Sequence, residues 1–386
     1  AVLAGAIGAP PVGAGAFHQK RVLLRGRDTL RAGGRSGSDS GRKRTSGMAA
    51  PVTLHLWAGW PHVLRAQQFD PPALERVFRE AQLAEEITNS GGSNLLKGKI
   101  ILTLFYEPST RTRLSFEFAT YHLGGRVLSS EAAREFSSAA KGESIEDTIQ
   151  VVCRYRPSAI VIRHYHEGAA ERAAAVALDV RTGRPIPVFN AGDGPGQHPT
   201  QALLDAYTIW RVRGTLEGTT VAVAGDLLNG RTARSLCYLL AKYPGVSFRL
   251  IAPKIVQMKD DLLAYLRRHK VPFLQTDDLM AGVRDADVLY VTRIQKERFH
   301  DQAIAQYEHL RDSFSVTQEL LAALPATAIV MHPLPRVEGA HSELPTSVDA
   351  DPRVVIFDQS EAGMYVRMAL LKLTCTADRL SGRPGR

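Results

Sequence analysis

Short apolar segments alternate with amphipathic segments along most of this chain, and this alternation limits its fold more than any other feature. Segments typical of strands occur first at residues 99–106, 126–129, 159–163 and 186–190. Five more follow at residues 219–224, 247–252, 271–275, 288–292 and 328–332. Because strands that alternate with helices are typical of parallel sheets covered on both faces, we expect an α/β protein with two doubly wound parallel-sheet domains.

Two helical segments indicate how the two sheets are connected. A helix carrying Leu203, Tyr207 and Trp210 follows the first set of strands and is expected to lead into the second. Residues 361–375 have the pattern of a long helix with one apolar face, which we expect to pack back across the first domain. The predicted domains are therefore residues 65–200 together with 360–380, and residues 201–359.

The first 50 residues differ in composition from the rest of the chain. They contain nine Lys or Arg and two Asp, and they are rich in Gly, Ala and Ser. This composition is typical of an organelle transit peptide, and a disordered basic tail is the alternative. The remaining residues hold 39 basic and 37 acidic side chains, so the net charge of +9 lies mostly in this segment. A nearly neutral body argues against a nucleic-acid-binding protein.

Length and composition exclude several other classes. The 386 residues, 44% of them hydrophobic, are enough for two buried cores. No apolar run approaches the roughly 20 residues that span a bilayer, so no membrane partner is expected. Cys153, Cys237 and Cys375 lie far apart without metal-ligand spacing, and we expect them to be reduced and structural.

The residues after the first strand carry the pattern that is most informative about function. Residues 105–117 (FYEPSTRTRLSFE) run from a strand into a helix that Ser109 is expected to cap. Free N–H groups in the first turn of such a helix suit a phosphate group. So do the hydroxyl groups and the guanidinium of this turn, at Ser109, Thr110, Arg111 and Thr112. An ordinary capped helix is the alternative, but this density of polar groups favours a phosphate site.

Residues 109–113 (STRTR) resemble the carbamoyl phosphate signature of the transcarbamoylases. Four more segments resemble motifs of that family in their order and spacing: residues 198–201 (HPTQ), 230–232 (GRT), 292–295 (TRIQ) and 332–335 (HPLP). The resemblance covers nearly all of residues 65–380 and is to the aspartate transcarbamoylases of plant chloroplasts. It implies transfer of a carbamoyl group from carbamoyl phosphate to L-aspartate, in de novo pyrimidine biosynthesis, without a metal or other cofactor.

The resemblance also implies which residues bind carbamoyl phosphate. They are Ser109, Thr110, Arg111, Thr112, Arg163, His198, Gln201, Leu334, Pro335 and, from a neighbouring subunit, Ser137 and Lys141. Thr112, Arg163 and His198 would polarise the carbonyl group, because attack by an amine creates a tetrahedral oxyanion. The amide of Gln201 and the backbone carbonyls of residues 334 and 335 would orient the carbamoyl amine. Lys141 would stabilise charge that develops on the leaving group.

The second substrate, L-aspartate, has two carboxylates, which require at least two guanidinium groups on rigid supports. Arg231 and Arg293 each follow an expected strand, and the resemblance assigns them to these carboxylates, assisted by Gln295 and Lys141. A surface salt bridge is the alternative for each arginine. In the family, the residues that match Ser137 and Lys141 reach into a neighbouring site, which implies a homotrimer with shared sites.

Three further expectations rest on the resemblance. Glu107 would pair with Arg231 and Arg298 when the domains close. Plant members of the family respond to uridine monophosphate, which we expect to compete at the phosphate site through Phe136, Ser137, Arg111, Arg163, His198, Arg231 and Arg293. Together with the basic N-terminal segment, the resemblance implies that the protein is located in the chloroplast stroma.

Two rival enzymes share parts of this pattern. Residues 225–232 nearly match the nucleotide-binding motif Gly-x-x-x-x-Gly-Lys-Thr, but Arg231 replaces the lysine and no acidic Mg²⁺ partner is evident. Ornithine transcarbamoylase shares the phosphate motif, but its signature reads His-Cys-Leu-Pro where this chain has residues 332–335, and its substrate has one carboxylate. His164 and His166 match no functional position, and we expect both in a solvated loop.

Overall fold

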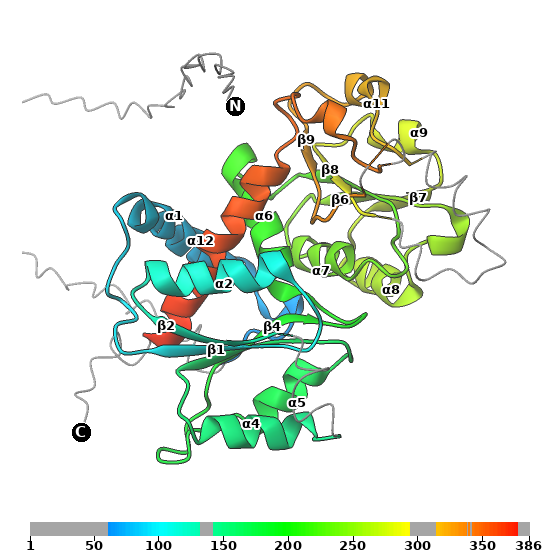
Figure 1. Cartoon of the computed structure of the whole chain (residues 1–386). Coiled ribbons are helices and arrows are strands. Elements are labelled where there is room, and N and C mark those ends of the chain that lie inside the picture. The colour runs from blue at the N-terminus through cyan, green and yellow to red at the C-terminus, as the bar shows by residue number, and fades with distance from the viewer. Residues whose placement is uncertain (1–60, 132–141, 294–313, 338, 340–341, 377–386) are drawn as a thin grey trace, which may run out of the picture. The chain divides into compact units, whose positions relative to one another are not determined.

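The computed structural model describes residues 61–131, 142–293, 314–337, 339 and 342–376. Within these residues the chain forms two parallel sheets, each with helices on both faces (Figure 1), which confirms the expected fold class. The first 50 residues, with the predicted transit peptide, lie outside the described residues. Among the described residues, no helix combines the length and apolarity needed to cross a bilayer, and no group of three or more His, Cys, Asp or Glu could hold a metal ion.

The first sheet has the strand order β2-β1-β3-β4, and all its strands are parallel. Its strands are β1 (Ile100–Phe105), β2 (Arg126–Ser130), β3 (Ala159–His164) and β4 (Val188–Asp193). Side chains alternate between two cores: Ile101 and Val161 pack on the face covered by α1 (Pro71–Asn89) and α2 (Thr110–His122). Leu104 and Ile160 pack under α4 (Ile145–Cys153) and α5 (Ala169–Val176) on the other face.

The second sheet has the order β7-β6-β5-β8-β9 and is also parallel throughout. Its strands are β5 (Thr220–Ala224), β6 (Ser247–Ile251), β7 (Phe273–Thr276), β8 (Val288–Val291) and β9 (Ile329–Met331). Helices α7 (Arg231–Leu240) and α8 (Asp260–Arg268) cover one face, and α9 (Leu279–Val283) and α11 (Gln318–Ala323) cover the other. Every strand within the described residues overlaps a segment expected from the sequence.

Two long helices join the lobes built on these sheets. Helix α6 (Pro199–Arg213) starts with proline at its first position and ends at Gly214, whose φ of 78° is a left-handed conformation that glycine tolerates. Helix α12 (Ile356–Cys375) packs against α1, α2 and α6, as Figure 1 shows in red. The expectation of a single apolar face was wrong for α12, because surrounding helices bury residues around most of its circumference, including Gln359 and Arg367.

The strand order of each sheet determines where a crevice for ligands can lie. In the first sheet, β2 lies on one side of β1 and β3 lies on the other side. In the second sheet, β6 lies on one side of β5 and β8 lies on the other. Loops that follow the carboxyl ends of such strand pairs diverge and leave a crevice for ligands. The loops after β1, β3, β5 and β8 contain residues 107–109, 165–168, 225–230 and 292–293, respectively.

Candidate active site

A cavity of about 410 Å³ lies at these carboxyl ends, and the structure brings most of the expected site residues together around it. Its lining includes Ser109, Thr110, Arg111, Thr112, Arg163, His198, Gln201, Arg231, Leu334 and Pro335. An adjoining hollow of about 460 Å³ shares Arg163 and Arg231 and adds Glu107 and Arg293. Phe136, Ser137, Lys141, Gln295 and Arg298 lie outside the described residues.

The first turn of α2 forms one end of the cavity. Ser109 occupies the N-cap position, as expected, but its hydroxyl makes no capping hydrogen bond within the described part of the chain. Arg113 is directed elsewhere, because its guanidinium pairs with Glu117 (3.1 Å) and Glu131 (3.0 Å). Arg111 lines the cavity, and partial burial lowers the pKa of its guanidinium. This end therefore presents N–H groups, hydroxyls and one cation, which suits an anion.

Two arginines from different lobes meet beside Glu107. Arg163, in β3, places Nη2 2.9 Å from Glu107 Oε2, and Arg231, the first residue of α7, places Nη2 3.3 Å from the same oxygen. Arg231 also donates to the carbonyl of Gly194 (2.6 Å), and Arg163 donates to that of Ala191 (3.1 Å). The expected contact between Glu107 and Arg231 is therefore present, with Arg163 as a further partner.

The arginine cluster carries more positive charge than Glu107 can balance. Burial, assisted by repulsion from Arg231 and Arg111, lowers the pKa of Arg163 to about 10, although Glu107 opposes this shift. Gly192 makes the close approach possible: its φ is 117°, and a Cβ atom there would lie 2.9 Å from Nη1 of Arg163 and 3.1 Å from Arg231. The backbone thus concentrates cations where a negatively charged ligand could neutralise them.

His198 lies next to these cations, at the N-cap of α6. Its backbone N–H donates to Ser235 Oγ (3.2 Å), and its ring is almost completely buried. Burial, together with repulsion from Arg231, Arg163 and Arg367, holds its pKa well below the ordinary value. The imidazole is therefore neutral, and its single N–H can donate a hydrogen bond without adding a charge to the site.

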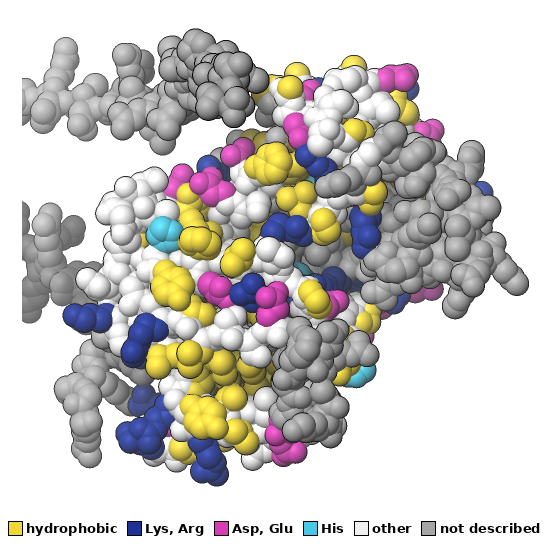
Figure 2. Space-filling model, viewed as in Figure 1, with side chains coloured by type: hydrophobic (Ala, Val, Ile, Leu, Met, Phe, Trp, Pro, Cys, Tyr) yellow, Lys and Arg dark blue, Asp and Glu magenta, His cyan; other side chains and the backbone are white. Residues whose placement is uncertain are grey.

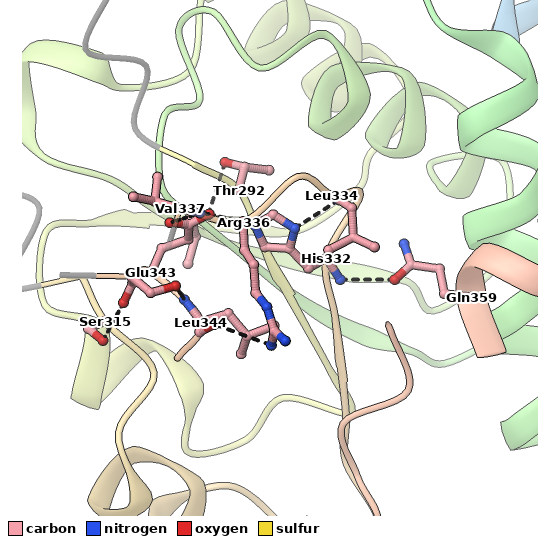
Figure 3. Close-up of polar contacts among 11 residues, drawn as sticks. Thr292, Ser315, His332, Leu334, Arg336, Val337, Glu343, Leu344 and Gln359 are labelled. Carbon is pink, nitrogen blue, oxygen red and sulfur yellow. Dashed lines mark hydrogen bonds and ion pairs between the residues drawn. The ribbon is translucent and has the colours of Figure 1, made fainter. Parts of the chain in front are cut away.

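Residues 332–335, in the loop that follows β9, also line the cavity, and Figure 3 shows the contacts that hold this loop. The Leu334 N–H donates to Nδ1 of His332 (2.8 Å), so the ring proton of neutral His332 is on Nε2, 3.0 Å from Glu343 Oε1. The His332 N–H donates to Gln359 Oε1 (2.9 Å). Leu334 has a left-handed φ of 51° and precedes a cis peptide bond to Pro335. These contacts fix the backbone of residues 332–335 against α12.

A buried polar group beneath the cavity was not anticipated from the sequence. Asp205 on α6 is fully buried and accepts hydrogen bonds from Gln201 (2.9 Å), Gln359 (2.7 Å) and Tyr290 (2.8 Å). Arg367 on α12 lines the cavity, donates to Thr200 Oγ1 (3.3 Å), and lies over the ring of Phe116. The available signal was a charged residue one helical turn after Gln201, flanked by apolar residues of the same helix.

Two other expectations can be compared with the structure. The expectation that His164 lies in a solvated loop was wrong: it belongs to β3, is buried, and stacks on Tyr165 with ring centroids 4.2 Å apart. Its Nδ1 accepts the His166 N–H at 3.0 Å, which gives it a packing role. In residues 225–232, Arg231 is directed to Glu107 and Gly194 of the first lobe, unlike the lysine of a nucleotide-binding loop.

Asp205 is expected to make folding stability depend on pH. Burial raises its pKa from 3.8 to about 7, so the folded chain retains a proton that the unfolded chain loses as the pH rises above about 4. The stabilisation of the folded state by this retained proton is complete below about pH 4 and is lost as the pH rises through about 7. The side chain of the Asp205→Asn variant cannot ionise. We therefore expect the melting temperature of wild type minus that of the variant to decrease by roughly 5 °C between about pH 5 and pH 8. A constant difference over this range would contradict a raised pKa.

Comparison with known proteins agrees with this geometry. Residues 61–211 match the family model "Aspartate/ornithine carbamoyltransferase, carbamoyl-P binding domain", and residues 217–374 match the "Asp/Orn binding domain" of the same family. Aspartate carbamoyltransferase 3, chloroplastic, of Pisum sativum is 53% identical over 312 residues, which cover 81% of this chain and 76% of the pea protein.

Solved structures of an aspartate transcarbamoylase from Trypanosoma cruzi are also similar. Its complex with carbamoyl phosphate has a TM-score of 0.74 at 38% identity, covering 81% of this chain and 94% of that one. Its complex with N-(phosphonacetyl)-L-aspartic acid has a TM-score of 0.73 at 38% identity, with the same coverage. By sequence and by structure, the chain therefore belongs to the aspartate carbamoyltransferase family.

Proposed function

We propose that this protein transfers the carbamoyl group of carbamoyl phosphate to the amino group of L-aspartate, which gives N-carbamoyl-L-aspartate and phosphate for de novo pyrimidine biosynthesis. The observation that supports this most strongly is the cluster of Arg111, Arg163 and Arg231 at the junction of the lobes, with Glu107 in contact with two of them. Two substrates that together carry a phosphate and two carboxylates would supply the missing negative charge.

In this proposal the first lobe binds the donor. The N–H groups and hydroxyls at the start of α2, with Arg111, bind the phosphate, while Thr112, Arg163 and His198 donate to the carbonyl oxygen. The carbamoyl amine donates to three acceptors, which are the side-chain oxygen of Gln201 on α6 and the carbonyls of residues 334 and 335 in the loop after β9. The proposed donor-binding domain comprises residues 65–200 and 360–380, and residues 201–359 bind the acceptor.

The reaction follows from this arrangement without a nucleophilic side chain. The lone pair of the neutral aspartate amine forms the new N–C bond, and the carbonyl π electrons move to the oxygen that faces the donors. When the carbonyl re-forms, the bond from carbon to the bridging phosphate oxygen breaks, and one proton of the attacking amine passes to the departing phosphate. Neutral His198 can stabilise the oxyanion as a donor, and the arginines can stabilise charge on the leaving phosphate. Lys141 would assist from a neighbouring subunit.

Arg231 and Arg293, assisted by Gln295 and Lys141, would bind the two carboxylates of aspartate. Ornithine transcarbamoylase is the less favoured alternative, because ornithine has one carboxylate and the similar plant proteins from pea and rice are named aspartate carbamoyltransferases. An assay of both amino acids distinguishes the two functions.

The substitution Arg231→Lys tests whether Arg231 binds aspartate. Lysine lacks the forked geometry with which arginine binds a carboxylate through two hydrogen bonds. We expect wild type to use aspartate and not ornithine. In the variant, the KM for aspartate should rise at least about tenfold, and that for carbamoyl phosphate by less than about threefold. Arg234→Lys is the matched control, because Arg234 lies one turn further along α7 and pairs with Asp261. Equal loss for both substrates would count against the role of Arg231.

We further propose that the protein forms a homotrimer with sites shared between subunits. The outer face of α2 and the edge strand β2 expose Leu114, Phe118, Tyr121 and Leu128, and Figure 2 shows apolar side chains gathered over this part of the first lobe. Residues 132–141, which contain Ser137 and Lys141, directly follow β2 in the chain. A second copy that covers this apolar face would bring its neighbour close to these two residues.

Shared sites predict complementation between inactive variants. Arg111→Ala and Lys141→Gln should each be inactive, but dissociating, mixing and reassembling them equally should restore about one quarter of wild-type activity, since each mixed trimer contains one intact site. Each variant reassembled alone is the control. If mass measurements show mixed trimers and activity does not return, the sites are not shared.

Regulation and location complete the proposal. Uridine monophosphate would inhibit by competing with carbamoyl phosphate, through Arg111, Arg163, His198, Arg231 and Arg293 together with Phe136 and Ser137; inhibition without such competition would exclude this site.

The pea relative is named chloroplastic, and the first 50 residues have the composition of a transit peptide. We therefore place the protein in the plastid, in the stroma.

A further inference from the structure

Asp205 binds three hydrogen-bond donors, and their arrangement on its two oxygens is informative. Oδ1 accepts from the side-chain nitrogens of both Gln201 (2.9 Å) and Gln359 (2.7 Å), while Oδ2 accepts from the hydroxyl of Tyr290 (2.8 Å). The three donors come from α6, α12 and β8. Asp205 is therefore a junction between the two lobes and the C-terminal helix, directly beneath the cavity.

The orientation of the two glutamine amides follows from this junction. Gln359 Oε1 accepts the backbone N–H of His332, so its Nε2 must be the atom that faces Asp205. Gln201 places its Nε2 2.9 Å from the same oxygen, and above about pH 7, where Asp205 is ionised, the carboxylate has no proton to donate and can only accept. The side-chain oxygen of Gln201 is then the atom left for the cavity, which Gln201 lines.

We propose that Asp205 is a specificity-determining positioning residue, which turns the oxygen of Gln201 toward the donor substrate and so selects an acyl phosphate with an amine over one with a methyl group. This inference rests on the proposed contact between Gln201 and the carbamoyl amine. The same carboxylate also holds Gln359, which fixes His332 and through it the N–H of Leu334. Asp205 thus supports both walls of the amine pocket.

The chemistry of the pocket explains the selection. With Asp205 ionised, the oxygen of Gln201 and the carbonyls of residues 334 and 335 are all acceptors, and a carbamoyl amine supplies two N–H donors to them. An acetyl group supplies none, which leaves buried acceptors unpaired. If Gln201 were free to rotate its amide, its NH₂ group could face the cavity, and this penalty against the methyl group would fall.

The structure defines an informative pair of substitutions. Asp205→Leu keeps the branched shape of the side chain, with methyl groups that are larger than the oxygens they replace, but it has no acceptor, so it releases the amide of Gln201. Asp205→Asn retains one acceptor, and because Gln359 can present only its nitrogen, the asparagine should turn its oxygen to the glutamines and its NH₂ to Tyr290. The asparagine variant should therefore keep the selectivity that the leucine variant loses.

The test compares dissociation constants for carbamoyl phosphate and acetyl phosphate, measured by titration calorimetry on the full chain at about pH 8, where Asp205 is ionised. We expect the ratio of the two constants, which is the selectivity, to fall about tenfold in Asp205→Leu and in Gln201→Ala, the effect of about one hydrogen bond. It should stay within about threefold of wild type in Asp205→Asn. Tyr290→Phe is the control, because it removes a bond to the other oxygen, and it should leave the ratio unchanged.

The outcomes separate this inference from the function on which it rests. If Gln201→Ala lowers the ratio and Asp205→Leu weakens both ligands equally, Asp205 is merely structural and the inference is wrong. If Gln201→Ala leaves the ratio unchanged, the proposed contact between Gln201 and the amine is wrong as well. Should Asp205→Leu fail to fold, Asp205→Ala replaces it, because water can solvate the freed amides in the space that alanine leaves.

Discussion

Repulsion among the arginines at the junction of the lobes is the constraint on which the rest of the structure depends. Arg163 and Arg231 share a single carboxylate oxygen of Glu107, and the field of Arg111 and Arg231 contributes to the lowered pKa of Arg163. Like charges this close, in a partly buried site, are unfavourable unless rigid elements hold them. The fold provides such elements in the carboxyl end of β3, the first turn of α7 and the glycine at residue 192.

The parallel topology explains why these charges meet. In each lobe the strand order reverses beside a central strand, so the loops after β1 and β3, and those after β5 and β8, open toward the same region. Helices α6 and α12 then connect the lobes beneath that region. Their polar residues Gln201, Asp205 and Gln359 form hydrogen bonds with one another and to the loop of His332, so the floor and one wall of the cavity are a single bonded unit.

Much of this arrangement could be predicted from the sequence, because it depends on local patterns. Most strands appeared as short apolar segments, and the proposed phosphate-binding end appeared as hydroxyls and arginine at a strand-to-helix turn. The partners of Asp205 come from helices and strands up to 154 residues apart, and no local pattern reports such contacts. Likewise, we expected His164 to be solvated because its side chain is polar, and the sequence does not show that the rings of Tyr106 and Tyr165 pack against it.

The central claim is that cations of both lobes form one site, which holds a phosphoryl group and a dicarboxylate at the same time. The most direct measurement compares the thermal unfolding of the protein with N-(phosphonacetyl)-L-aspartate, which joins both groups in one molecule, and with an equal concentration of phosphate plus L-aspartate. Because linked groups lose less entropy on binding, the joined ligand should raise the melting temperature by several degrees more than the separate ones. A rise no larger than that given by the separate ligands would contradict a single site.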